Sequence, residues 1–237
     1  MDIDYSGYHR DFEYIENERL FRNIFMKRFN MLWPHFTNVS RGKVLDVGCS
    51  NGVFLDIFKE RGWQTFGVEP SKSGTEAKRK GHKVTQIYFE KSHFPDSYFD
   101  LVIMNHTLEH VNDAGLVLKM IHNILKKDGL LYVDVPNAGG LGSKIMRDAW
   151  PLRLPKEHNY QFTKSSLSKK IKDAGFKITR FESRSGLFEF ASPLSELWQS
   201  FSTFKRRFFV NLLLLPYSFL ATSLNMGDSM SIIAKNK

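Results

Sequence analysis

The chain is predicted to be an α/β protein with one mostly parallel sheet of seven strands and helices on both faces. Short apolar runs alternate with helical segments between residues 44 and 181, and this β-α-β rhythm is typical of parallel sheets. A length of 237 residues fits one elaborated domain more easily than two. A hydrophobic content of 42% is enough for a packed interior. We therefore expect a single folded unit over residues 1–237.

Each strand is expected from a short apolar run bounded by turn residues. These runs are 44–47, 65–68, 83–87, 101–104, 130–135, 177–181 and 229–234. Helices are expected between them, at 53–61, 75–80, 115–125 and 164–174. In the segment 115–125 the apolar residues recur at helical spacing, and Gly175 marks the end of the last helix.

Two helical additions are predicted outside this alternation. Apolar residues recur every three to four positions over the first 38 residues, and Pro34 is expected to end that helix. Residues 182–228 are rich in aromatic and aliphatic side chains and are expected to form a helical cap inserted before the last strand. The organisation expected is therefore an N-terminal helical segment (1–40), a core (41–181), the cap, and the last strand (229–237).

The chain carries 34 Lys and Arg against 25 Asp and Glu, a net charge of +9 that favours an anionic partner. The excess lies in residues 151–210, with twelve basic and five acidic side chains. The apolar stretch 208–221 is shorter than the ~20 residues that span a bilayer, so no transmembrane helix is expected. A lone cysteine, Cys49, excludes an internal disulfide, and the first residues contain no secretory signal. These features predict a cytoplasmic protein, with peripheral membrane contact through 204–220 as an alternative.

The turn after the first strand predicts a nucleoside site. In LDVGCSNG, residues 45–52, a strand leads through glycines into a helix, so backbone N–H groups can approach a ligand closely. Glu69 ends the second strand, 23 positions after Asp46, where a carboxylate can accept hydrogen bonds from both ribose hydroxyls. The glycine spacing fits neither the dinucleotide fingerprint nor a P-loop. The expected ligand is a nucleoside without a pyrophosphate.

Together these segments resemble class I S-adenosylmethionine (SAM)-dependent methyltransferases, especially the small-molecule enzymes of ubiquinone biosynthesis and polysaccharide clusters. The similar stretches are 44–55, 66–71, 95–111, 125–137 and 150–176. The resemblance implies a Rossmann-like sheet and SAM as cofactor. It implies that cofactor contacts come from Asp46, Gly48, Cys49, Gly52, Glu69, Pro70 and Asn105.

Within that set, the resemblance places Asp46, Gly48 and Gly52 around the methionine part, Glu69 at the ribose, and Asn105 beside the sulfonium. Two departures from the family pattern concern the turn and the adenine. Ser50 replaces a common glycine, and Tyr88 and Phe89 stand where relatives often have an acidic residue that faces the adenine amino group. We expect stacking and backbone contacts to hold the adenine instead.

Methyl transfer from a sulfonium is an in-line displacement, and alignment in a dry site can supply up to ~7–11 kcal/mol of the barrier reduction. For a hydroxyl acceptor, a neutral histidine is the natural proton acceptor. His158 is the first catalytic candidate because it lies in the irregular segment after the fifth strand, beyond the carboxyl ends of the strands. His110, after the fourth strand, is the second. The alternative for His158 is a loop-bridging structural histidine.

His106, Glu109 and His110 have i, i+3, i+4 spacing and, with His158, form a candidate divalent-metal site. Some methyltransferases have Glu-x-x-Glu-His at this position plus a later histidine, whereas here His106 replaces the first glutamate. Many relatives with Leu-Glu-His bind no metal. We therefore expect no metal ion, and a structural role for Glu109 and His110.

The leading functional interpretation is an enzyme that methylates a small or lipid-linked acceptor, at a hydroxyl of a sugar, polyketide or quinone-like ring. An RNA methyltransferase is favoured by the charge, but no RNA-binding module is appended, so nucleic acid is not the expected partner. A third interpretation is a non-catalytic scaffold. Ser50, Tyr88 and Phe89 favour it, whereas Asp46, Gly52 and Glu69 argue against it.

Overall fold

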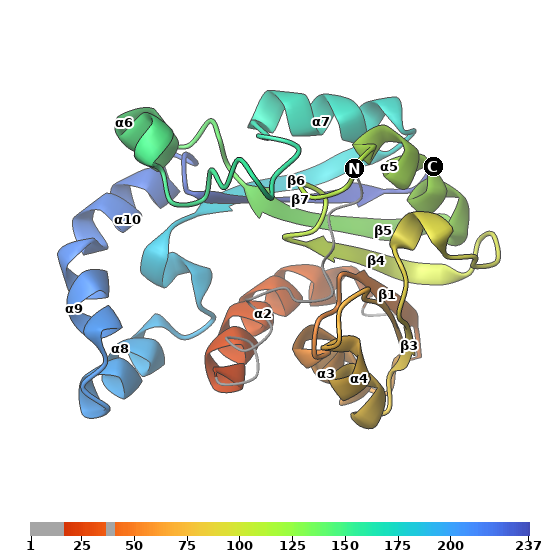
Figure 1. Cartoon of the computed structure of the whole chain (residues 1–237), viewed down its shortest axis with the longest axis horizontal. Helices are drawn as coiled ribbons and strands as arrows, with labels where there is room; N and C mark the ends of the chain where they lie inside the picture. Colours follow the sequence, from red (N-terminus) through yellow and green to blue (C-terminus); the bar gives the residue numbers. More distant parts are fainter. Residues whose placement is uncertain (1–16, 37–40) are drawn as a thin grey trace.

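The computed structural model describes residues 17–36 and 41–237, which contain one seven-stranded sheet (Figure 1). The strands are β1 (Lys43–Val47), β2 (Gln64–Val68), β3 (Lys83–Thr85), β4 (Phe99–Asn105), β5 (Leu125–Pro136), β6 (Lys177–Arg184) and β7 (Ser229–Lys235). Their order across the sheet is β3-β2-β1-β4-β5-β7-β6, and β7 runs antiparallel to both of its neighbours while the other pairs are parallel. The expected α/β class with a mostly parallel sheet is confirmed.

Several strand boundaries differ from the predictions, most of all that of β5, which begins at Leu125 rather than at residue 130 and takes the last residue of the predicted helix 115–125. Strand β3 stops at Thr85, and the next side chain, Gln86, donates to the Ser71 carbonyl at 3.2 Å. The chain then enters the short 3-10 helix η2 (Phe89–Lys91). Strand β6 continues past the predicted end at 181, and Arg184 still pairs with Ser229 of β7. The last residues of β6 are polar, so a prediction based on apolar runs does not include them.

Each face of the sheet is covered by helices (Figure 1). On one face, α5 (Ala114–Ile124) and α7 (Lys164–Asp173) pack on residues such as Val102 and Val133. The other face is covered by α2 (Glu18–Leu32), α3 (Val53–Lys59) and α4 (Gly74–Arg79), over Leu101 and Ile103. These apolar contacts hold the helices against both faces of the sheet. They thereby position the carboxyl ends of the strands, where a site can form.

The N-terminal helix is present but shorter than predicted within the described part of the chain. Helix α2 ends at Leu32, and Pro34 lies in the following 3-10 helix η1 (Trp33–Phe36), consistent with its missing N–H donor. The parts of the prediction that fall on residues 1–16 and 37–40 lie outside the described residues. Phe25 stacks on Phe54 of α3 with ring centres 4.8 Å apart, which holds α2 against the core.

The predicted helical insertion before the last strand is also present. It comprises the 3-10 helix η4 (Gly186–Glu189), α8 (Pro193–Ser202), α9 (Arg206–Leu213) and α10 (Leu215–Ser223). The three α-helices form an arc at one end of the sheet, close to α6 (Leu141–Met146) (Figure 1). None of the helices in 17–36 and 41–237 is long and apolar enough to cross a membrane.

Candidate functional site

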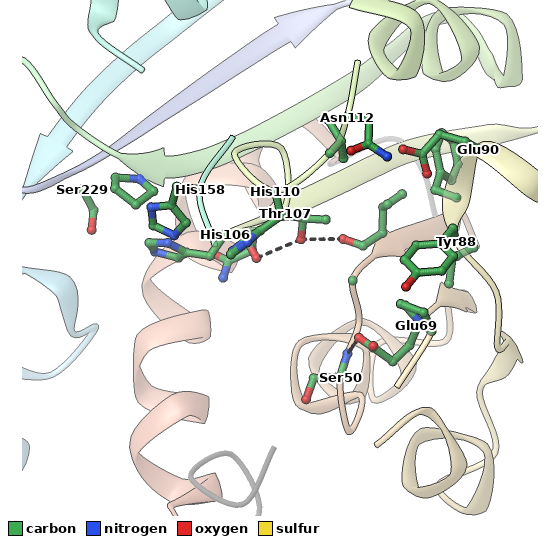
Figure 2. A pocket seen from close by; sticks show the side chains of 18 of the residues that line it. Ser50, Glu69, Tyr88, Glu90, His106, Thr107, His110, Asn112, His158 and Ser229 are labelled. Carbon is green, nitrogen blue, oxygen red and sulfur yellow. Dashed lines mark hydrogen bonds between the residues drawn. The ribbon is translucent and has the colours of Figure 1, made fainter. Parts of the chain in front are cut away.

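A cavity of about 520 Å³ lies at the carboxyl ends of β1, β2, β4 and β5, beneath helix α2. This is the edge at which open α/β sheets bind ligands. Figure 2 shows two groups of lining residues, with Ser50, Glu69 and Tyr88 on one side and His106, His110, His158 and Ser229 on the other. We call the first the glycine-turn end and the second the histidine end.

The glycine turn has a backbone that side chains would not tolerate. Gly48 has φ +79°, and a Cβ there would lie 2.5 Å from Thr107 Oγ1. That hydroxyl donates to the Val47 carbonyl at 2.9 Å, which ties the end of β4 to the end of β1 (Figure 2). The N–H groups of Gly48 and Cys49 donate to the Val68 carbonyl, which fixes the turn against the end of β2.

Glu69 is oriented by the backbone on both of its oxygens. Its Oε2 accepts from the Ser50 N–H and its Oε1 from the Ser71 N–H, each at 2.9 Å. The side chain is 8% exposed and lines the cavity. A carboxylate oxygen can accept more than one hydrogen bond, so Glu69 can also accept from ligand hydroxyls.

Beside the main cavity, Asp46, Ser50, Asn51 and Asn105 line a smaller pocket. Asp46 Oδ1, Ser50 Oγ, Asn105 Oδ1 and both amide atoms of Asn51 are buried and make no hydrogen bond to any residue within the described ranges. Burial, and then the charge of Glu69, raise the pKa of Asp46 well above its ordinary value. Buried polar groups in folded proteins are nearly always paired, so these atoms are candidates for hydrogen bonds to a ligand. The smaller pocket itself has a volume of only about 20 Å³, close to that of one water molecule.

The predicted cofactor residues occupy three kinds of position. Gly48, Glu69, Pro70 and Asn105 line the main cavity, and Asp46 and Cys49 line the smaller pocket. Gly52 lines neither, and a Cβ there would lie 2.7 Å from a ring carbon of His82, so packing explains this glycine. Its cofactor contact stays a prediction.

At the far side of the glycine-turn end, the adenine prediction was incomplete. Tyr88 and Phe89 line the cavity as expected, but Glu90, Asn112 and Asp113 line it too. The turn η2 carries Glu90 to the wall, so an acidic side chain is present a position or two later than the family pattern suggests. The position of this acidic residue could not be predicted by its distance in sequence from the end of β3, because a 3-10 helix follows that strand.

The two predicted catalytic histidines are brought together. The rings of His110 and His158 meet edge to face, with centres 4.7 Å apart, and both line the cavity. His110 Nδ1 lies 2.9 Å from the Glu157 carbonyl, which can only accept, so Nδ1 is the donor. In the neutral ring this leaves Nε2 as the proton-accepting nitrogen.

Three of the four candidate metal ligands lie close together, and the fourth does not. One donor atom each from Glu109, His110 and His158 lie within 4.8 Å of one another, a carboxylate and imidazole set that suits a divalent transition metal. His106 takes another position, with Nδ1 3.3 Å from Glu109 Oε1 and Nε2 3.7 Å from Asp134 Oδ1. Burial lowers the pKa of His106, but these two carboxylates raise it further, so the net shift is upward. A protonated His106 offsets the Glu109 charge that a metal would need, and the metal-free expectation stays a prediction.

A buried charge network, which the sequence analysis did not predict, lies against the histidine end. Arg28 and Glu189 line the cavity and pair with each other through Nη2 and Oε2. Asp134 Oδ2 lies 3.4 Å from Arg28 Nε and 2.7 Å from Arg184 Nη2, and Arg184 Nε lies 3.5 Å from Glu189 Oε2. We call these four residues the buried ion network. The four residues come from α2, β5, β6 and η4, and Arg184 is also paired with Glu182 at 3.2 Å.

Comparison with known proteins agrees with this geometry. Residues 17–180 match the family model described as a methyltransferase domain. The ubiquinone biosynthesis O-methyltransferase of Bradyrhizobium diazoefficiens is 29% identical over 175 residues, and that of a second Bradyrhizobium strain is 30% identical over the same length. Both matches cover 66% of this chain and 64% of the relative, so the chain matches less than two thirds of the length of these relatives.

Solved structures share the fold at low identity. A SAM-dependent methyltransferase from Archaeoglobus fulgidus superposes with a TM-score of 0.60 at 24% identity, over 90% of this chain and 94% of that one. Phosphoethanolamine N-methyltransferase 2 from Haemonchus contortus, in complex with SAM, gives 0.70 at 19%, over 99% of this chain and 59% of that one. The chain therefore belongs to the methyltransferase domain family, and its fold is that of SAM-dependent methyltransferases.

Proposed function

We propose that this protein transfers the methyl group of SAM to a hydroxyl of a small-molecule or lipid-linked acceptor, such as a sugar, polyketide or quinone-like ring. The observation that carries the proposal is one cavity with Glu69 at one end and the His110–His158 pair at the other. The names of the Bradyrhizobium relatives, which are O-methyltransferases, support oxygen as the acceptor atom.

The glycine-turn end is proposed to hold the cofactor. Glu69, fixed by two backbone N–H groups, accepts from the ribose hydroxyls, and Asp46 and Asn51 pair with the methionine ammonium and carboxylate. Asn105, at the end of β4, lines the cavity and is proposed to face the sulfonium. Bound SAM supplies the activated methyl group, and the protein supplies its alignment with the acceptor oxygen.

The histidine end is proposed to take the acceptor proton. His110 donates through Nδ1 to Glu157, so its Nε2 is oriented as a hydrogen-bond acceptor. The edge-to-face contact with His158 holds both rings at the cavity wall. A base so placed accepts the hydroxyl proton as the oxygen attacks the methyl group, an effect worth ~10²–10⁴-fold.

The direct test is methyl transfer from radiolabelled SAM to two acceptor pools, water-soluble glycosides and phenols, and a bacterial lipid extract. Label in a low-molecular-weight product supports methylation of a small molecule, and release of that label as methyl iodide by hydriodic acid supports oxygen as the methylated atom. Label that appears only in added RNA would replace the proposal with RNA methylation. The pool that accepts label distinguishes soluble from lipid-linked acceptors.

We infer further that residues 204–220 contact a membrane surface, as a lipid-linked acceptor requires. Helices α8, α9 and α10 and the link between α8 and α9 expose an unusual number of large apolar side chains, with Phe204 89%, Leu213 81% and Trp198 70% exposed. Between residues 197 and 227 the charged residues are Lys205, Arg206 and Arg207, all basic, and Arg207 is paired with Glu196 at 2.8 Å. An apolar face beside a basic cluster is the pattern of an interfacial helix on anionic lipid.

Vesicle sedimentation tests the membrane contact. Phosphatidylglycerol vesicles are expected to retain the protein, and phosphatidylcholine vesicles to retain less. The double variant Phe209→Ser/Leu213→Ser should weaken retention on phosphatidylglycerol, as should Lys205→Glu/Arg206→Glu. The charge-matched control Lys172→Glu/Lys177→Glu lies outside the cap and should bind as the wild type. Equal retention of all variants would contradict the contact.

A further inference from the structure

Of the two carboxylate oxygens of Glu189, one is paired with an arginine and the other makes no hydrogen bond to the described residues. It lies in η4, between β6 and the cap helices, and lines the histidine end of the cavity. Its Oε2 is paired with Arg28 and lies 3.5 Å from Arg184 Nε. Its Oε1 is buried, and no hydrogen bond reaches it from the residues that the structure describes. Leaving such a group unpaired costs roughly 1–3 kcal/mol, so a ligand that supplies the missing donor would gain accordingly.

The chemistry of this carboxyl restricts what it can bind. Burial raises the pKa of Glu189, but Arg28 and Arg184 lower it more, so the group stays ionised. An ionised carboxylate accepts hydrogen bonds and donates none. The group that fills the Oε1 position must therefore be a donor, an O–H or an N–H.

The charge of the surroundings favours a neutral donor. Both side chains that pair with Glu189 are cations, Arg28 and Arg184. An ammonium at Oε1 would lie close to these two guanidinium groups, and burying a further cation beside them is costly. A hydroxyl donates without adding a charge.

Glu189 also lies outside residues 17–180, which match the family model. The cap, rather than the shared core, brings this side chain to the cavity wall. It shares the histidine end with His158 and Ser229. An acceptor hydroxyl presented to the histidines can therefore lie in the same cavity as a second group presented to Glu189.

We propose that Glu189 is a specificity residue, which selects acceptors that carry a second hydroxyl besides the one that is methylated. Oε1 accepts a hydrogen bond from that second hydroxyl, while Arg28 and Arg184 hold the carboxylate from its other side. The acceptor class is thus a polyol or a dihydroxylated ring. This inference rests on the proposed function, since it presumes that the histidine end binds the acceptor.

The test compares probes that differ by one hydroxyl, on protein saturated with S-adenosylhomocysteine. Dissociation constants are measured by ligand-detected NMR for catechol against phenol, and for methyl glucoside against its monodeoxy analogues. The wild type should bind at least one dihydroxy or polyol member about tenfold more tightly than its partner, the effect of one hydrogen bond to a charged group. In Glu189→Gln, the arginines hold the amide oxygen, the NH₂ group takes the Oε1 position, and the preference should disappear.

Two controls separate this outcome from simpler ones. Glu182→Gln makes the same charge change beside Arg184, at 3.2 Å, but lies outside the cavity lining and should keep the preference. If Glu189→Gln does not fold, Glu189→Asp keeps the charge, withdraws the carboxylate from the cavity and gives the same readout. A wild type without any hydroxyl preference, or a variant that keeps it, overturns the inference. Loss of S-adenosylhomocysteine binding by the wild type would overturn the proposed function instead.

Discussion

The two ends of the cavity are specified in different ways. The main features of the glycine-turn end lie at the tips of β1 and β2, within residues 47–70, and are close together in the sequence. The histidine end collects Arg28, His158, Glu189 and Ser229 from widely separated segments, two of which lie beyond the family match at residue 180. We therefore expect the local motif of the glycine-turn end to hold the cofactor. The residues that the fold brings together at the histidine end are expected to hold the acceptor, which can differ from that of the relatives.

The largest effect is expected for the histidine pair. The double variant His110→Ala/His158→Ala should lower kcat for a hydroxyl acceptor by ~10²–10⁴-fold, because the proton acceptor is lost while the methyl donor is still aligned. S-adenosylhomocysteine affinity should stay unchanged if the two ends are independent. The matched control is His93→Ala, an exposed histidine outside the cavity lining. An unchanged kcat would remove the histidine end from the chemistry.

The buried ion network should dominate the stability of the histidine end. Asp134→Ala leaves Arg28 and Arg184 buried without their shared carboxylate, and breaking such a pair costs about 3–5 kcal/mol of unfolding free energy. Urea denaturation measures this change in unfolding free energy. Asp173→Ala, which removes an exposed i,i+4 pair with Lys169, is the control and should cost less than about 1 kcal/mol. Equal costs would mean that the network does not brace the cavity.

A smaller effect should follow acidification. Burial raises the pKa of Asp134, but Arg28, Arg184 and His106 lower it to about 2 overall. Because the folded pKa lies below the unfolded value of about 3.9, this stabilisation is complete above about pH 4 and is lost as the pH falls toward 2. The loss should be roughly 2 kcal/mol and should be absent in Asp134→Asn. Parallel acid titrations of wild type and variant would contradict the assignment.

The smallest effect concerns the glycine-turn end. Burial and Glu69 raise the pKa of Asp46, whereas a bound ammonium would favour its ionised form. Affinity for S-adenosylhomocysteine should therefore rise several-fold with pH through the raised pKa, and binding should release a proton. Calorimetry in two buffers of different ionisation enthalpy detects that proton. Asp46→Asn should show no release, and release by this variant would place the titrating group elsewhere.

The sequence was most informative where structure is local. All seven strands, the glycine turn, and the approach of His110 to His158 could be predicted, because strand ends in a parallel sheet share one edge. The buried ion network could not, since Arg28 and Glu189 are 161 positions apart and charged residues are ordinarily read as exposed. One signal was present: Asp134 interrupts an apolar strand that the parallel-sheet pattern buries on both faces.

The measurement that tests the central claim most directly is calorimetric titration of S-adenosylhomocysteine into wild type, Glu69→Ala and the exposed control Glu60→Ala. Glu69 is predicted to anchor the ribose through charge-assisted hydrogen bonds, each worth about 1.5–3 kcal/mol. The account predicts one site per chain in the wild type and in Glu60→Ala, and a loss of about 100-fold or more in Glu69→Ala. Binding that is absent from the wild type, or equally tight in Glu69→Ala, would contradict it.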